Sequence, residues 1–392
     1  MAKAVFTHYD RIYGRSEVAP DDLAIYQTPQ FARLNRVSLS AIPTWVQPTG
    51  VAASKAEHSR GVRFLAKLLV KSAHWRIKKE AVNIVLAATL HDIGTPPFSH
   101  LSEPFQIALT GQNHEEFSRK LLVNTEIGRV IRSQGGNLNT ILSYIEGVNP
   151  PLSDLVNGSI DLDNLDNTLR FGQSVGLLAS GSYYRPERLV KAFVFQKNGQ
   201  LVLSGRYLDQ IKAWERCRHQ VYNYLYSREN LAPAAMLTRA LHFAHRNGEL
   251  DKNFFLKTDD GALHYLRGLN PKTAKLIHRA YHWQFYQEVF SFDRTVDAPV
   301  FPSMYDYTRF SGRLSDAIAQ SFKLPPEDVA AIAQFDKGFR KIHLPILGRR
   351  RKFAHQPAKS PRFMIRVYVK SDDKVNLKKL KALVKKQIAT IG

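Results

Sequence analysis

The stretch KKEAVNIVLAATLHDIGTPPFSH, residues 78–100, joins a buried helix to polar side chains that a buried helix does not need. Its first part is an almost purely apolar run, which predicts a helix enclosed by protein on all sides. The helix is expected to end before Pro96, because proline cannot continue it. His91 and Asp92 stand side by side at that end, and His100 follows the prolines. We therefore expect the chain to place imidazoles and a carboxylate at the edge of its core.

The composition is that of a globular protein with a sizeable core. The chain has 392 residues, of which 44% are hydrophobic, so one large domain or two to three ordinary ones are expected. The apolar stretch Ala81–Leu90 is too short to span a bilayer, and the first residues show no signal-peptide pattern. A single cysteine, Cys217, excludes an internal disulfide framework. These features predict a cytoplasmic protein without membrane contact.

The net charge of +22 is concentrated near the end of the chain. Residues 337–392 contain 17 Lys and Arg but 2 Asp and Glu, whereas the rest of the chain contains 39 and 32. Such a basic segment can bind nucleic acid in a salt-dependent manner, with GRRRKF (348–353) as the expected contact. Its lysines can equally be the solvated face of a helix whose apolar stripe packs on the protein or at an oligomer interface. Both interpretations stay open at this point.

The pattern of apolar residues predicts a mainly α fold. Residues 189–204 alternate around Asn198-Gly199, which predicts a small β-hairpin. Residues 362–370 predict a strand, and a helix with an apolar stripe of Leu377, Leu380, Val384 and Ile388 follows it. Segments with helical spacing are expected within 28–39, 57–73, 78–92, 114–133, 163–177, 208–227, 232–248, 271–290 and 327–335. The expected division is 1–50 as an entry segment, 51–180 as a metal-site core, 181–336 as a helical extension with the hairpin, and 337–392 as the basic C-terminal segment.

Four side chains from three separate stretches make a plausible ligand set for a divalent cation. His58 lies near the start of one predicted helix, His91 and Asp92 end the next, and Asp163 begins a later one. Two imidazoles and two carboxylates leave room for water on the metal and suit Mn, Mg, Fe, Ni or Zn. A bound metal lowers the pKa of its water and neutralises phosphoryl charge.

At these residues the sequence resembles the HD-domain phosphohydrolases, and specifically their deoxynucleoside triphosphate triphosphohydrolase branch. The resemblance implies an HD-type helical fold with one divalent metal ion. It is carried by ordered blocks: TPQFARL (28–34), EHSRGVRFLAKLL (57–69), LHDIGTPPFSHLSE (90–103), NHEEFSRKLL (113–122) and IDLDNLDNTLR (160–170), and more weakly by RHQVYNYLY, MLTRALHFA and FLKTDDGALHYL (255–266).

The resemblance also implies roles for individual residues. The implied metal ligands are His58, His91, Asp92 and Asp163. Asp163 is favoured over Asp161, and Asp161 and Asp166 are expected to be helix caps or surface charges. His100 and His114 match active-site histidines that position water or protonate a leaving group. Glu115 is expected to orient His114, and Glu103 matches an acidic position three residues beyond His100. The implied substrate-binding residues are Lys55, Arg170 and Tyr222, with a structural carboxylate partner as the alternative role for Arg170 and buried packing for Tyr222.

The sequence departs from the family where the substrate is held. The branch commonly has histidine where this chain has Thr95, and lysine, tyrosine and an acidic residue at the positions of Asn164, Asn167 and Phe171. Lys55 stands where arginine is usual, and arginine and lysine differ at a bidentate phosphate site. The sequence thus predicts that the metal ligands are intact, whereas the residues that would bind the triphosphate and the sugar differ from those of the family.

Three functions are compatible with these features. The leading hypothesis is a metal-dependent phosphohydrolase that cleaves a (deoxy)nucleoside triphosphate into nucleoside and triphosphate. The first alternative is a metal-dependent nuclease or modified-nucleotide hydrolase that binds nucleic acid through residues 337–392. The second is a non-catalytic regulatory protein that keeps the cage for structure. A homo-oligomer is expected in each case.

Overall fold

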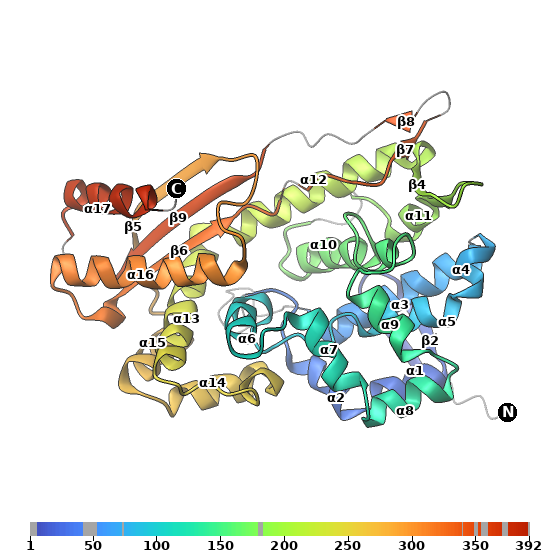
Figure 1. Ribbon diagram of the computed structural model, residues 1–392, viewed down its shortest axis with the longest axis horizontal. Coiled ribbons are helices and arrows are strands. Elements are labelled where there is room, and N and C mark those ends of the chain that lie inside the picture. The colour runs from blue at the N-terminus through green and yellow to red at the C-terminus, as the bar shows by residue number, and fades with distance from the viewer. Residues whose placement is uncertain are drawn as a thin grey trace.

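The computed structural model describes residues 6–41, 53–72, 74–178, 183–338, 340–348, 352–353, 360–370 and 375–390 (Figure 1). In this view a helical region, comprising α1 to α12, lies on the right, and a sheet region, comprising α13 to α17 with β5, β6 and β9, lies on the left. The fold is mainly α, as predicted. Within the described residues, no helix combines the length and apolarity needed to cross a bilayer.

Four helices form the centre of the helical region and carry most of the site residues. They are α3 (Lys55–Ser72), α5 (Ala81–Leu90), α10 (Leu162–Ser174) and α12 (Leu208–Leu225). α5 packs on α3, α3 on α10, and α10 on α12. The apolar run of α5 is buried as predicted from Ile84 to Leu90, whereas Val82 in its first turn is exposed. Shorter helices surround this centre: α1 (Pro20–Tyr26), α2 (Pro29–Arg33), α4 (Trp75–Lys79), α6 (Glu103–Thr110), α7 (His114–Leu122), α8 (Glu126–Ser133), α9 (Leu138–Ile145) and α11 (Pro186–Leu189).

Two hairpins border the helical region. The predicted one is confirmed as β3 (Phe193–Phe195) and β4 (Leu201–Ser204), with Gly199 at φ 85° in its turn. β7 (Ile346–Leu347) pairs in parallel with β4, and β8 (Lys352–Phe353) pairs with β7. The other hairpin, β1 (Phe6–Asp10) and β2 (Gly14–Val18), lies in the entry segment 1–50, where no strand was predicted.

The sheet region is built on three antiparallel strands in the order β5 (Gln287–Thr295), β9 (Arg362–Val369) and β6 (Val329–Phe335). One face is covered by α16 (Met304–Phe322) and α17 (Leu377–Ala389). The other is covered by α13 (Arg228–Arg246), on which α14 (Asp259–Arg267) and α15 (Pro271–Tyr281) pack in turn. The predicted strand and C-terminal helix are therefore confirmed. Leu380 and Val384 of the predicted stripe are buried, whereas Leu377 is exposed.

The prediction of a helix over 327–335 was wrong, and the one over 271–290 was confirmed for α15 (Pro271–Tyr281) but wrong at its end. Residues 329–335 form β6, and the last part of 271–290 begins β5 after α15 ends. In β6, Val329 and Ala331 face α16, while Ala330 and Ile332 face α13. Because both faces are buried, the strand shows no alternation of apolar and polar residues, and its alanines favour a helix locally. Helix α16 was not predicted at all.

The basic C-terminal segment does not form a separate unit in the described part of the chain. Its strand β9 lies between β5 and β6 of the preceding segment, so the predicted boundary at residue 336 falls within one sheet. Residues 349–351 of GRRRKF lie outside the described residues, so the structure does not test that predicted contact.

Candidate active site

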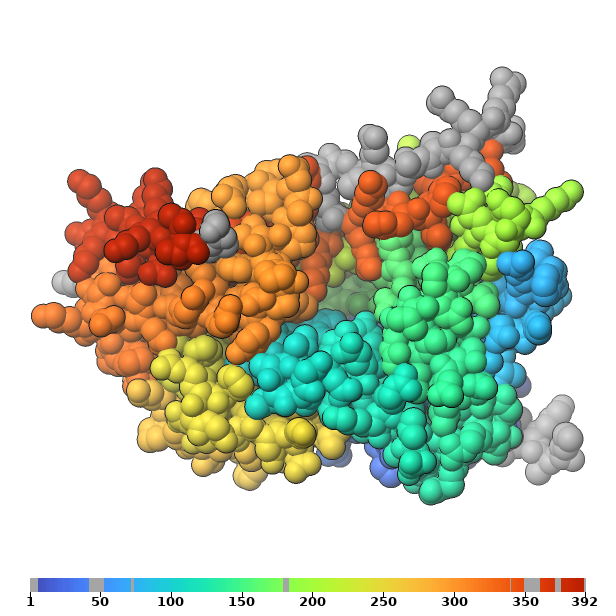
Figure 2. Space-filling model, viewed as in Figure 1, coloured from blue at the N-terminus to red at the C-terminus, as the bar shows by residue number. Residues whose placement is uncertain are grey.

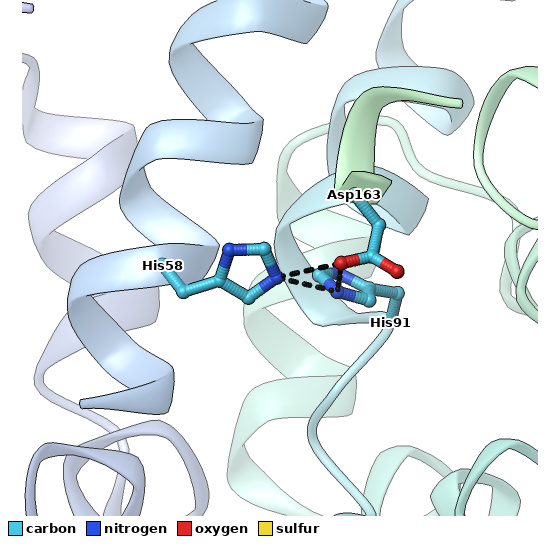
Figure 3. A group of neighbouring side chains, drawn as sticks. All are labelled: His58, His91 and Asp163. Carbon is cyan, nitrogen blue, oxygen red and sulfur yellow. Dashed lines mark hydrogen bonds and ion pairs between the residues drawn. The ribbon is translucent and has the colours of Figure 1, made fainter. Parts of the chain in front are cut away.

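Three of the side chains predicted as metal ligands, His58, His91 and Asp163, converge on one point (Figure 3), and Asp92 lies beside them. His58 lies in the first turn of α3, His91 follows α5, and Asp163 lies in the first turn of α10. His58 Nε2 is 3.0 Å from Asp163 Oδ1 and 3.2 Å from His91 Nε2. Asp92 Oδ2 lies 3.2 Å from His91 Nε2 and 3.6 Å from His58 Nε2. His58, His91 and Asp163 thus place donor atoms within 4.8 Å of one another, and Asp92 lies beside both histidines.

The donor set fits a divalent cation. His91 Nδ1 donates to the Ala88 carbonyl at 2.9 Å, and His58 Nδ1 is 2.7 Å from Asp166 Oδ1, so each Nε2 is directed at the centre. Burial would lower the pKa of His91, but Asp92 and Asp163 raise it well above its usual value. The centre therefore has the negative potential that attracts a cation, and its nitrogen and oxygen donors suit Mn, Fe, Ni or Zn.

Asp166 is neither a cap nor a surface charge, which corrects the prediction. It is fully buried and bonds to His58, to the Tyr13 hydroxyl at 2.8 Å and to Arg170 Nε at 2.7 Å. Burial raises the pKa of Asp166, but Arg170 and His58 outweigh burial and lower it to about 2. Asp161, in contrast, does cap α10, by accepting from the Asn164 amide. Asp166 fixes the ring of His58, as second partners of metal-bound histidines commonly do.

Arg170 takes the structural role that the sequence left as an alternative. Its guanidinium is buried and donates to Asp166, to Glu57 at 3.0 Å and to Asp10 at 2.9 Å. Asp10 belongs to the unpredicted hairpin β1–β2, so this hairpin is tied to the metal centre through one arginine. No sequence signal linked residue 10 to residue 170, because they meet only in the tertiary structure.

Lys55 and Thr95 both bond to Asp92 rather than pointing freely at a substrate. Lys55 Nζ donates to Asp92 Oδ2 at 2.8 Å, and Thr95 Oγ1 donates to Asp92 Oδ1 at 2.8 Å. Burial would raise the pKa of Asp92, but Lys55 and His91 keep it well below its usual value. Arg33 holds the following loop through the carbonyls of Ile93 and Thr95. Lys55 therefore orients Asp92, and its role in substrate binding stays a prediction.

Glu103 orients the two further histidines. His100 Nδ1 lies 2.8 Å from Glu103 Oε2, while His114 Nδ1 and the His114 amide bond to Glu103 Oε1. Glu115 was expected to orient His114, but its carboxylate lies 3.7 Å from His114 Nε2. Burial lowers the pKa of His114, and Glu103 more than compensates, raising it to about 9. His114 Nε2 lies 3.9 Å from Asp92 Oδ1, so this histidine pair borders the metal centre.

The geometry agrees with comparisons to known proteins. Residues 56–156, which contain three of the four converging ligands, match the HD domain family. This part of the chain is an HD domain. The HD protein is 26% identical over 245 residues to an uncharacterized protein of Methanocaldococcus jannaschii, covering 62% of this chain and 50% of that protein. It is 28% identical over 160 residues to the deoxynucleoside triphosphate triphosphohydrolase SAMHD1 of Gallus gallus, covering 37% of this chain and 26% of that protein. The chain thus spans half or less of the length of these relatives.

Solved structures share the fold over nearly the whole HD protein. A hypothetical protein from Aquifex aeolicus superposes with a TM-score of 0.72 at 20% identity, covering 97% of this chain and 100% of the other. A phosphohydrolase from Bacteroides thetaiotaomicron gives a TM-score of 0.66 at 18% identity, covering 93% and 99%. The sheet region is therefore part of a fold that other proteins possess.

A cavity of about 370 Å³ lies near the metal centre of the HD protein, and none of the four proposed metal ligands is among its lining residues. His100 and Asn167 line it, and Asn167 lies one helical turn after Asp163 on the same face of α10. The opposite wall comes from the sheet region, mainly from α16 and β6. Figure 2 shows a recess on this face between the orange C-terminal part and the green helices. The remaining lining is largely apolar and includes Phe171, Leu225, Leu231, Met304 and Ile332.

The predicted residue Tyr222 lines this cavity among cations. Its hydroxyl accepts from Arg218 Nη2 at 3.3 Å, and Arg218 Nη1 donates to Asn164 Oδ1 at 3.0 Å. Burial would raise the pKa of Tyr222, but Arg218, Lys337 and Arg340 lower it below its usual value. Arg218, Lys337 and Arg340 were not predicted as site residues. The charge run in the sequence drew attention to the region beyond residue 337, but not to its contact with α10 and α12.

Proposed function

We propose that this HD protein is a metal-dependent phosphohydrolase that acts on a nucleotide, with a deoxynucleoside triphosphate as the first candidate. The observation that carries the proposal is the convergence of His58, His91, Asp92 and Asp163 on one point, beside a cavity of ligand size. The family match and the partial likeness to SAMHD1 support the class of reaction.

The metal would be held by these four side chains. A divalent cation bound there would act as a Lewis acid on the phosphoryl group and activate a water for attack. Asp166, through His58, and Lys55 with Thr95, through Asp92, keep the ligands in position. Such fixed positioning is what reactions at phosphorus require.

The histidine pair supplies the proton chemistry. Because Glu103 accepts from the Nδ1 side of both rings, their Nε2 atoms are available on the side of the centre or the cavity. His114 Nε2, close to Asp92, is placed to hold a proton at the attacking water or the leaving oxygen. His100 borders the cavity, where the leaving group would lie.

A product analysis tests the proposal. Purified protein is incubated with each dNTP and Mn or Mg, and the products are separated by anion exchange. Nucleoside and tripolyphosphate are expected from at least one dNTP, and neither from the Asp92→Ala variant. Absence of tripolyphosphate with every dNTP would remove this substrate class. A bound metal without turnover on a broad panel of phosphate esters would instead support the regulatory alternative.

The nuclease alternative gains no specific support from the described residues. In the basic segment, β9 is the central strand of its sheet, and Leu380 and Val384 of α17 pack against that sheet. Part of the segment therefore has a structural role, and nucleic-acid binding remains a prediction from charge alone.

A further inference from the structure

At position 164 the deoxynucleoside triphosphate triphosphohydrolase branch commonly has lysine. In this chain the residue is Asn164, and two arginines bond to its side chain. Asn164 Oδ1 accepts from Arg218 Nη1 at 3.0 Å and from Arg340 Nη1 at 3.1 Å. Arg340 comes from the connection between β6 and β7, which runs beside α10 and α12, and its Nη2 donates to the Gly158 carbonyl at 2.7 Å. Two guanidinium groups thus share one uncharged acceptor, directly after the proposed metal ligand Asp163.

A third cation, Lys337, belongs to the same connection as Arg340. Lys337 lines the cavity, and its carbonyl accepts from Arg218 Nη2 at 2.8 Å. Its exposed side chain contacts Met304 Sδ at 3.3 Å. Arg218 Nη2 donates to the Tyr222 hydroxyl at 3.3 Å, and Lys337 lines the same cavity as Tyr222.

These cations are poorly compensated. In the part of the chain that the structure describes, no carboxylate lies within 4.0 Å of the charged nitrogens of Arg218, Lys337 or Arg340. The acidic groups near them are engaged elsewhere: Asp161 accepts from Asn164 and Gly158, and Asp336 accepts from the Gly338 amide and from Arg362. Arg218 is 6% exposed, and its Nε has no hydrogen-bond partner. A buried, unpartnered donor among unpaired cations is costly unless an anion completes it.

We propose that Arg218, Lys337 and Arg340 form a clamp for the phosphate chain of the substrate, in place of a lysine at position 164. The inference rests on the proposed function, because it sets the phosphates between this clamp and the metal centre. The apolar part of the cavity then takes the organic group of the same molecule. Asn164 spaces the arginines, and its uncharged side chain is what allows two of them to approach.

The substrate class follows from this charge. Three cations beside a divalent metal suit a ligand with several negative charges, such as a nucleoside triphosphate or diphosphate, better than a singly charged diester. The connection between β6 and β7 is thereby assigned to substrate binding, although its sequence shows only a basic composition.

Binding of inorganic tripolyphosphate tests the clamp without any reaction. The full chain is treated with EDTA and dialysed, and the Kd is measured by isothermal titration calorimetry. Lys337→Gln is expected to weaken binding about tenfold, as for loss of one charge-assisted bond. The matched control is Lys341→Gln, which removes the same charge from an exposed lysine of the same connection outside the cavity and should change the Kd less than about twofold.

Arg340→Gln gives a second reading and should also weaken binding about tenfold, with its thermal unfolding measured because Arg340 bonds to Gly158 and Asn164. Equal effects of the Lys337 and Lys341 variants, or no tripolyphosphate binding by the wild type, would overturn the clamp. Since the metal is removed, failure of the hydrolysis assay leaves this measurement intact. Conversely, hydrolysis of a dNTP with unchanged binding by Lys337→Gln would reject the clamp and keep the proposed function.

Discussion

The buried cations around the metal centre are bonded to carboxylates, whereas those beside the cavity are bonded to uncharged groups. Around His58 each buried cation has anionic partners: Arg170 bonds to three carboxylates and Lys55 to Asp92. Around Asn164, the arginines bond to an amide, a hydroxyl and carbonyl groups. The first arrangement is complete within the protein and holds the ligands rigidly. Among the residues that the structure describes, no carboxylate bonds to the cations of the second arrangement, as is expected of a site that binds an anionic ligand.

The largest effect is expected from replacing Arg170, whose charge neutralises buried carboxylates beside the metal centre. Arg170→Met leaves Asp10 and Asp166 buried without their cation, and should lower the free energy of unfolding by about 3–5 kcal/mol. Urea denaturation measures this loss. The control Arg119→Met breaks an exposed pair with Glu146 and should cost about 1 kcal/mol or less. Similar losses for both variants would contradict the assignment of Arg170 as a buried structural hub.

Asp163→Ala tests the metal centre itself. Loss of a direct ligand should lower metal affinity by at least about 100-fold, more than loss of an outer partner, and abolish hydrolysis. Metal content after dialysis, measured by mass spectrometry, checks this. Asp161→Asn is the matched control on the same helix, since asparagine caps a helix as well as aspartate does. Full metal retention by Asp163→Ala would show that Asp163 is not a ligand.

Asp22, in the helical region, forms another buried ion pair, and its loss should lower the free energy of unfolding less than the loss of Arg170. Asp22 is buried and bonds to Arg63 at 2.5 Å and to Lys67 at 2.6 Å. Asp22→Asn should destabilise by about 2 kcal/mol at pH 7, the value of a hydrogen bond to a charged group. Burial raises the pKa of Asp22, but Arg63 and Lys67 lower it below its ordinary value overall.

The pH dependence of that difference has a definite sign. A carboxyl with a lowered folded-state pKa stabilises fully above its unfolded pKa of about 3.9 and loses this contribution as the pH falls through the folded value. The gap in unfolding free energy between wild type and Asp22→Asn should therefore shrink below about pH 4. Asp21→Asn, at an exposed neighbour, should leave the unfolding free energy nearly unchanged throughout. A gap that stays constant down to pH 2 would speak against the ion pair.

The smallest effect should come from the apolar side of the cavity. Thr308 lies on α16 and lines the cavity opposite α10, so Thr308→Phe narrows it. The Kd of a dNTP should rise about tenfold, the cost of forcing bulk into an occupied space, while that of tripolyphosphate should not change. Gln320→Phe, on the exposed face of the same helix, serves as the control. Equal weakening of both ligands by Thr308→Phe would remove the division into an apolar and an anionic half.

The sequence alone determined the helical core and the metal-ligand candidates. The buried helix ending in His91-Asp92, the hairpin at Gly199 and the C-terminal strand and helix all follow from local patterns of apolar residues, turn residues and family motifs. The tertiary structure decided what depends on pairing across distance. The alanine-rich segment β6 is a strand because it is buried on both faces of the sheet, and Asp166 bonds to His58. Likewise, Glu103 rather than Glu115 bonds to His114 Nδ1, Lys337 lines the cavity that α10 and α12 border, and Arg340 bonds to Asn164 of α10. Such contacts join residues tens to hundreds of positions apart, and no local spacing encodes them.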